Sequence, residues 1–177
     1  MKNIKPLNDI VKPSLVLVLV AAVVAGAVMS VYRLTYEEPA DGMPEEAGIA
    51  AAELLGTTPE NFTEIPGEYS DGIIAAVRTE NKSVAVNLTV SGYSGEDSID
   101  MVVAASPDGK IIGLRILKSR ETPNIGTKAF EPEFLDQFSG KSKTVERSDV
   151  DIVSGATITC DAVLEGINIA LSAADKI

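Results

Sequence analysis

The sequence predicts an α+β fold: one N-terminal transmembrane helix, followed by a domain with an antiparallel sheet and flanking helices. Three observations support this prediction. Residues 14–32 are 19 uncharged, mostly apolar residues, close to the ~20 needed to cross a bilayer as a helix. Residues 84–90 place valine or leucine at every second position, the pattern of a strand with one buried face. Residues 106–109, Ser-Pro-Asp-Gly, separate two further apolar runs and favour a β-hairpin.

The apolar run is interpreted as a transmembrane helix at 14–34, with residues 1–13 in the cytoplasm. Lys2, Lys5 and Lys12 precede it, whereas carboxylates dominate the residues that follow. Lysines on the short side predict a single-pass protein of the cell membrane, with its N-terminus cytoplasmic and its bulk extracytoplasmic. The alternative is a signal peptide cleaved near residues 25–27. Because the apolar region of such peptides usually has about 7–15 residues and this run continues to residue 31, a retained anchor is favoured.

Residues 35–71 are expected to form a linker and a membrane-proximal helix. The linker runs from Pro39 to Pro44 and contains Gly42. A helix from Pro44 to Leu55 is predicted because proline suits a first turn, acidic residues follow it, and Gly56 stands just past the end.

The remaining domain, residues 72–177, begins with the sheet. Strands are expected at 72–78, 84–90, 99–105 and 110–117, with a loop at 92–95. Alternating patterns and short turns favour antiparallel pairing of these strands.

Helices are expected after the sheet. Phe130, Phe134 and Phe138 lie four residues apart, which would place their rings on one helix face packed on the sheet, and Gly140 would end that helix. Residues 145–153 are expected to return as a strand or extended segment. A last helix is predicted at 160–174, with Thr159 as its N-cap and Asp161 in its first turn.

Composition excludes several classes of function. The net charge of −11 and the isoelectric point near 4.4 argue against nucleic-acid binding, which requires clustered lysine and arginine. The chain has no histidine and one cysteine, Cys160, so no zinc site, internal disulfide or histidine-based catalysis is expected. Chemistry must therefore come from carboxylates, hydroxyls or a cofactor, and the cofactor is favoured.

Residues 151–159, Asp-Ile-Val-Ser-Gly-Ala-Thr-Ile-Thr, are the strongest candidate site. Ser154, Gly155 and Ala156 have little side-chain bulk, so another molecule can approach the backbone closely. The first amides of the following helix lack intrahelical partners, and the helix dipole favours an anion there. Thr157 could therefore hold a phosphate or be joined covalently to one.

The same residues fit D-x-x-[ST]-G-A-[TS], the motif of proteins that carry covalently attached FMN, and Ser119–Gly126 resembles the E-T-P-G-L-G segment of those proteins. Over about residues 72–175 the chain thus resembles the FMN-binding domain family. With its anchor, it is similar to the family of G subunits of Rnf electron-transport complexes.

The resemblance implies specific roles for residues of both segments. A flavin transferase would recognise Asp151 and esterify the phosphate of FMN onto Thr157. Neither catalytic residues in turnover nor metal ligands are implied. The residues implied to surround the cofactor are Ser154, Gly155, Ala156 and Thr159, together with Glu121, Thr122, Pro123, Ile125 and Gly126.

Two positions depart from the family pattern. Asn124 stands where the family has glycine, but asparagine tolerates left-handed backbone geometry, so the loop shape is expected to survive. Cys160 replaces a common serine. A thiol at a helix N-terminus can have a low pKa, yet a buried, inert thiol is the favoured interpretation.

By resemblance, the chain is an electron-transfer subunit of an ion-translocating ferredoxin:NAD oxidoreductase complex, without independent catalytic activity. Its partners would be the other membrane and peripheral subunits and the flavin transferase. Ferredoxin and NAD are not expected to bind this chain, which lacks cluster-binding cysteines and a dinucleotide fingerprint. The alternatives are the C subunit of a sodium-translocating NADH:quinone reductase, a stand-alone extracytoplasmic flavodomain, and a cofactor-free anchored scaffold.

Overall fold

The computed structural model describes residues 7–35, 42–67, 69, 72–142 and 144–176. The chain divides into two compact units, residues 1–39 and residues 40–177, and each is described by itself. Lys2, Lys5 and the first part of the predicted linker, residues 39–41, lie outside the described residues.

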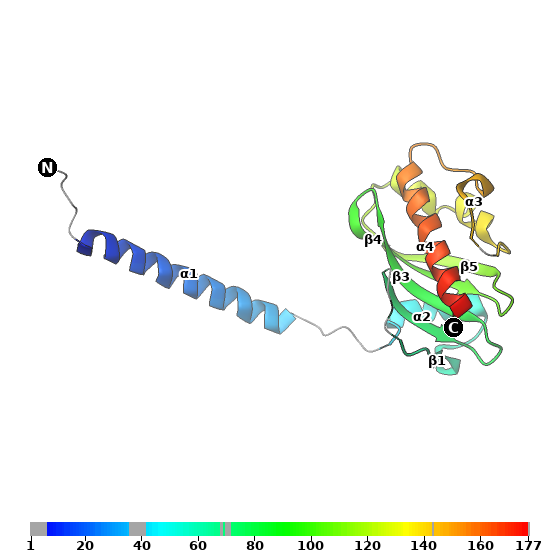
Figure 1. The fold of residues 1–177 in the computed structure, drawn as a ribbon, viewed down its shortest axis with the longest axis horizontal. Coiled ribbons are helices and arrows are strands. Elements are labelled where there is room, and N and C mark those ends of the chain that lie inside the picture. The colour runs from blue at the N-terminus through cyan, green and yellow to red at the C-terminus, as the bar shows by residue number, and fades with distance from the viewer. Residues whose placement is uncertain (1–6, 36–41, 68, 70–71, 143, 177) are drawn as a thin grey trace. The chain divides into compact units, whose positions relative to one another are not determined.

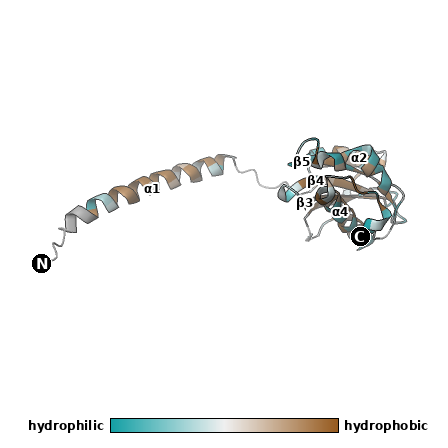
Figure 2. Cartoon of the chain, turned by 90° about the horizontal axis from the view of Figure 1, so that it is seen from above, coloured by the Kyte–Doolittle hydropathy of each residue, from teal (hydrophilic) through white to brown (hydrophobic). Residues whose placement is uncertain are grey.

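The first unit contains one helix, α1 (Leu7–Thr35). It begins seven residues before the predicted boundary and includes Pro13. From Val11 to Thr35 its side chains are exposed, and Figure 2 shows them as almost continuously apolar. The hydroxyl of Ser30 donates to the carbonyl of Gly26 (2.7 Å), which satisfies a polar group inside the helix. The structure thus confirms an apolar helix long enough to span a membrane.

The second unit is built on a five-stranded antiparallel sheet in the order β1-β2-β3-β4-β5 (Figure 1). Its strands are β1 (Thr63–Glu64), β2 (Ile73–Arg78), β3 (Val84–Gly92), β4 (Gly95–Ala105) and β5 (Ile111–Ser119). The four predicted strands and their antiparallel pairing are confirmed. Strand β1 was not predicted, because a two-residue strand is too short to show a period.

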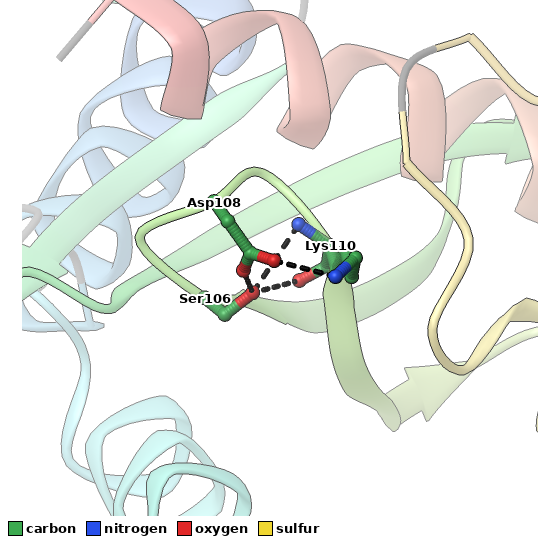
Figure 3. Close-up of polar contacts among 3 residues, drawn as sticks. All are labelled: Ser106, Asp108 and Lys110. Atoms are coloured by element: carbon green, nitrogen blue, oxygen red, sulfur yellow. Dashed lines mark hydrogen bonds and ion pairs between the residues drawn. The ribbon is translucent and has the colours of Figure 1, made fainter.

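The β4–β5 turn has the predicted hairpin chemistry, shown in Figure 3. Gly109 has a φ of +74°, and its N–H donates to the carbonyl of Ser106 (2.9 Å). The Ser106 hydroxyl donates to Asp108, whose other oxygen lies 2.6 Å from Nζ of Lys110. These hydrogen bonds to Lys110 and then Ser106 hold the pKa of the exposed Asp108 down to about 2. Local side chains therefore fix the register of β4 and β5.

Two helices cover opposite faces of the sheet (Figure 2). The predicted helix α2 (Glu45–Leu55) presents alanines to Val77, Ala85 and Val102. The longer helix α4 (Thr157–Lys176) packs against the larger core, which includes Leu88 and Met101. α4 also has the length and composition of a membrane span, but half of it is buried, as expected of a core helix.

The predicted phenylalanine helix is wrong. The segment forms a 3₁₀ turn (Gly126–Phe130), a short helix α3 (Pro132–Leu135) and another 3₁₀ turn (Asp136–Phe138). Pro132 has no N–H and would clash with the preceding turn, so a helix cannot continue through it. Phe134 and Phe138 are nevertheless buried, with ring centroids 5.2 Å apart at 84°.

The two other short elements are 3₁₀ turns at Pro59–Asn61 and Arg147–Asp149. The second interrupts residues 145–153, which form no strand. The prediction of a continuous strand or extended segment there is therefore wrong.

Candidate functional site

The candidate site begins at a tight turn before α4. The N–H of Ala156 donates to the carbonyl of Val153 (3.1 Å), and Gly155 between them has a φ of +85°. The carbonyl of Ala156 then accepts the N–H of Cys160 (2.9 Å), the first bond of the helix. The helix starts at Thr157, three residues earlier than predicted, so Thr159 as its N-cap is wrong. Asp161 consequently lies past the first turn, where it pairs with Arg147 at 3.0 Å.

The first turn of α4 presents its two threonines to different surroundings. Thr157 is exposed, whereas Thr159 is 1% exposed. The backbone N–H groups of residues 157–159 precede the first bond of the helix and lack an intrahelical acceptor, and the helix dipole adds partial positive charge there. No atom lies within 4 Å of the place where a side chain on Gly155 would begin. The surroundings of the Thr157 hydroxyl thus suit a phosphate group.

The loop that follows β5 has the predicted shape. The N–H of Ile125 donates to the carbonyl of Thr122 (3.2 Å), with Pro123 and Asn124 at the centre of the turn. Asn124 has a φ of +60°, the left-handed geometry expected where the family has glycine. Thr122, Pro123 and Ile125 are exposed, whereas Gly126 is buried.

Glu121 connects this loop to α4. Its Oε2 accepts the Thr159 hydroxyl at 2.6 Å, which brings the two predicted segments together. Its Oε1 accepts the N–H of Ser94 (3.0 Å) and the hydroxyl of Ser98 (3.1 Å). Burial raises the pKa of Glu121, but the hydrogen bonds from Thr159, Ser94 and Ser98 outweigh it and the pKa is lowered. With 4% exposure, Glu121 is a buried anion that contacts protein donors.

Three exposed apolar residues are sequence neighbours of residues in this junction. Tyr93 (68% exposed), Ile125 (55%) and Ile158 (53%) immediately precede Ser94, Gly126 and Thr159, the residues packed around Glu121. Tyr93 and Ile158 were not predicted as site residues, because neither occupies a position that the motifs specify.

Asp151 is held through its backbone. Nε2 of Gln137 donates to the carbonyl of Asp151 (3.2 Å), and Oε1 of Gln137 accepts the Asp151 N–H (2.7 Å). The Asp151 residue is exposed, so its carboxylate is presented at the surface. No sequence pattern indicates the role of Gln137, which lies 14 residues away.

Cys160 lies inside the core with 0% exposure, and burial raises the pKa of its thiol. This agrees with the interpretation of an inert thiol, because the reactive form is the thiolate.

A separate hollow of about 890 Å³ lies away from these residues. Its lining includes Arg78, Lys82, Asp108 and Ser172 and none of the predicted site residues. The candidate site is therefore the surface around Thr157 and the Glu121 junction.

Comparison with known proteins identifies the domain in which these residues lie. Residues 92–172 match the model of the FMN-binding domain. This range contains Tyr93, Glu121, the loop after β5 and the first turn of α4.

The chain is also similar to curated proteins that are described as G subunits of ion-translocating oxidoreductase complexes. The chain is 31% identical over 132 residues to the G subunit of the Na(+)-translocating ferredoxin:NAD(+) oxidoreductase complex of Acetobacterium woodii, covering 68% of this chain and 59% of that protein. It is 35% identical over 102 residues to the G subunit of the proton-translocating ferredoxin:NAD(+) oxidoreductase complex of Clostridium ljungdahlii, covering 52% and 54%. The G subunit of an ion-translocating oxidoreductase complex of Methanosarcina acetivorans is 27% identical over 177 residues, covering 93% and 94%. The chain thus spans little more than half of the first two relatives and nearly all of the third.

Proposed function

Because residues 92–172 of this chain belong to the FMN-binding domain family, we propose that the chain carries one FMN joined by a phosphoester to Thr157. We further propose that it serves as the electron-transfer subunit of a membrane-bound, ion-translocating oxidoreductase complex. The observation that carries the proposal is the exposed hydroxyl of Thr157, in the first turn of α4, directly after the open turn at Gly155.

The residues around Thr157 fit both parts of FMN. Unpaired N–H groups and the helix dipole would stabilise the phosphate by about 0.3–1 kcal/mol per charge. Tyr93, Ile125 and Ile158 would hold the ring system on their exposed apolar surfaces. Ser154 and the loop from Thr122 to Gly126 would border it. When bound, the flavin supplies the capacity to take up and release one or two electrons; the chain supplies its position and its electrostatic surroundings.

Attachment would require a flavin transferase, and the exposed Asp151 is the proposed recognition residue. Gln137 bonds both the N–H and the carbonyl of Asp151, so the backbone is fixed at Asp151, in the segment that leads to Thr157. The transferase would take the Thr157 hydroxyl as its acceptor and FAD as its donor. The Thr157 oxygen would bond to the phosphorus of the FMN half as the pyrophosphate bond breaks, and AMP and the hydroxyl proton would be released.

The relatives' descriptions support the assignment to a complex. Helix α1 would keep the domain beside integral membrane subunits. The lysines before the apolar run at residues 14–32 and the carboxylates after it support a cytoplasmic N-terminus and an extracytoplasmic flavin domain. A covalent tether would prevent loss of the flavin by dilution on that side. Ferredoxin and NAD would react at other subunits.

Intact mass of the full chain, co-expressed with a flavin transferase, tests the attachment. We expect one added FMN in wild type and in Thr157→Ser, and none in Thr157→Ala. In-gel flavin fluorescence after denaturation gives an independent readout. A fluorescent band that persists in Thr157→Ala would overturn the assignment of Thr157, and a wild-type chain without flavin would favour the scaffold alternative.

Two further experiments test membership of a complex and orientation. Purification of the tagged chain from native membranes is expected to recover integral membrane subunits, and recovery of the chain alone would favour a stand-alone flavodomain. Protease added outside intact spheroplasts is expected to digest residues 42–176, whereas protection there would place the domain in the cytoplasm.

A further inference from the structure

Glu121 is the one buried carboxylate among the described residues around the candidate site, and its oxygens face inward. Its three hydrogen-bond donors come from the β3–β4 turn (Ser94), from the start of β4 (Ser98) and from the first turn of α4 (Thr159). These donors lie 23 to 38 residues away from it in sequence. Strand pairing already places the first two donors beside the end of β5, whereas Thr159 belongs to a helix, so the Glu121 side chain joins the first turn of α4 to the β3–β4 hairpin.

Two glycines make room for this carboxylate. A Cβ on Gly92 would lie 2.6 Å from Oε1 of Glu121, and a Cβ on Gly126 would lie 2.8 Å from Oε2. Neither glycine has a positive φ, so the reason for glycine at both positions is space. The backbone therefore closes on Glu121 from two sides, and a larger side chain at either glycine would displace it.

The junction also determines where Thr157 lies. Thr159 and Thr157 belong to the same helical turn, so fixing the inward hydroxyl of Thr159 fixes the outward position of Thr157 relative to the sheet. The hydrogen bond is charge-assisted and buried, which makes it stronger than one between neutral groups.

We propose that Glu121 is a positioning residue, which locks the first turn of α4 to the β3–β4 turn so that the Thr157 hydroxyl is presented in one fixed place for flavin attachment. The inference rests on the proposed function, and it assigns Glu121 a structural role in place of direct contact with the flavin. Its role is exerted through Thr159, and it does not touch the transferred group.

The test compares Glu121→Gln and Thr159→Val with Thr159→Ser in the full chain. Glu121→Gln keeps the shape but removes the charge, and Thr159→Val keeps the shape but removes the donor; Thr159→Ser retains the donor and should restore wild-type behaviour. Each chain is offered at several concentrations to a flavin transferase supplied with FAD as flavin donor, and attachment is followed by intact mass. We expect the turnover number of attachment to fall about tenfold or more in the first two variants. The KM for the chain should stay unchanged, because Asp151 is untouched.

Hydrogen exchange gives a readout that does not depend on flavin. In the same two variants, the amide of Cys160, which makes the first hydrogen bond of α4, should exchange about tenfold faster or more, and in Glu121→Gln the amide of Ser94 should do so as well. Wild-type attachment rates and unchanged exchange in Glu121→Gln and Thr159→Val would overturn the proposal. If Glu121→Gln does not fold, as judged by circular dichroism, the pair Thr159→Val and Thr159→Ser decides alone.

The outcomes separate this inference from the proposed function. A wild-type chain that never gains flavin, together with the expected change in exchange, would reject the attachment and retain the junction. A wild-type chain that gains flavin, with variants that match it in both measurements, would reject the junction and retain the attachment.

Discussion

At the scale of single residues, two threonines in the first turn of α4 have different roles. Thr157 faces outward, where a hydroxyl can be modified, and Thr159 faces inward, where a hydroxyl can hold a buried anion. Both residues are threonines, so only their positions on the helix distinguish the proposed site of flavin attachment from the hydrogen-bond donor to Glu121. The residue between them, Ile158, adds exposed apolar surface beside the acceptor.

Gly155 permits a matched comparison with Gly109. Both have a positive φ, and neither has an atom within 4 Å of a built Cβ, so alanine would cause backbone strain without a clash. We expect Gly155→Ala and Gly109→Ala each to lower the free energy of unfolding by about 1–2 kcal/mol in urea titrations. Only Gly155→Ala should also slow flavin attachment measured by intact mass. Equal attachment rates in the two variants would contradict a role for this turn in the site.

The lowered pKa of Glu121 predicts a specific dependence of stability on pH. Because the folded-state pKa lies below the ordinary value of 4.5, the ionised form stabilises the fold fully above that value. That stability is lost as the pH falls below 4.5 through the folded-state pKa. We expect Glu121→Gln to be less stable than wild type by about 1.5–3 kcal/mol at pH 7. The difference should narrow below pH 4.5 in urea titrations, and a constant difference would contradict an ionised Glu121.

At the scale of elements, side chains hold segments that have no backbone ladder. Gln137 makes two hydrogen bonds to the backbone of Asp151, as a neighbouring strand would. We expect Gln137→Ala to lower the free energy of unfolding by about 1–3 kcal/mol and to speed amide exchange at Asp151. Gln137→Glu keeps the acceptor for the Asp151 N–H and loses the donor, so its exchange at Asp151 should be intermediate. Exchange rates that match wild type in Gln137→Ala would show that the segment is held by other contacts.

The β4–β5 hairpin allows a local titration. NMR titration should give Asp108 a pKa of about 2, and Lys110→Gln should move it back towards 3.8, because the largest cause is the hydrogen bond from Lys110. Ser106→Ala should produce a smaller change. The contribution of ionised Asp108 to the stability of the fold is fully present above pH 3.8 and is lost as the pH falls towards about 2. A pKa in Lys110→Gln that stays near 2 would contradict this order of causes.

Local patterns predicted four strands, the β4–β5 hairpin, α2 and the left-handed Asn124. Local patterns did not predict the burial of Glu121, which depends on contacts between residues far apart in the sequence. The donors to Glu121 are 23 to 38 residues away, so its burial could not be inferred from the loop sequence. The start of α4 was placed too late because the pattern of small residues 154–156 resembles a loop up to Thr159. The phenylalanine helix is wrong for a local reason, because Pro132 prevents a helix that begins earlier from continuing through it.

At the scale of the whole molecule, the two units are expected to be thermodynamically independent. Both hydrophobic cores are formed by residues after Gly42, within the second unit. Residues 40–177 alone should therefore be soluble. Their free energy of unfolding should lie within about 0.5 kcal/mol of that of the full chain in detergent. Urea titration followed by circular dichroism measures both. A much lower midpoint for the shorter chain would mean that α1 stabilises the domain.

The order of the sheet has a consequence for when the protein matures. Strands that pair only with their sequence neighbours can assemble progressively, but the junction at Glu121 draws on the β3–β4 turn, the end of β5 and α4. The acceptor hydroxyl therefore takes its place only after the last helix has docked. An enzyme that recognises this geometry would modify finished copies and ignore nascent or misfolded ones, so cofactor loading would itself act as a checkpoint on folding.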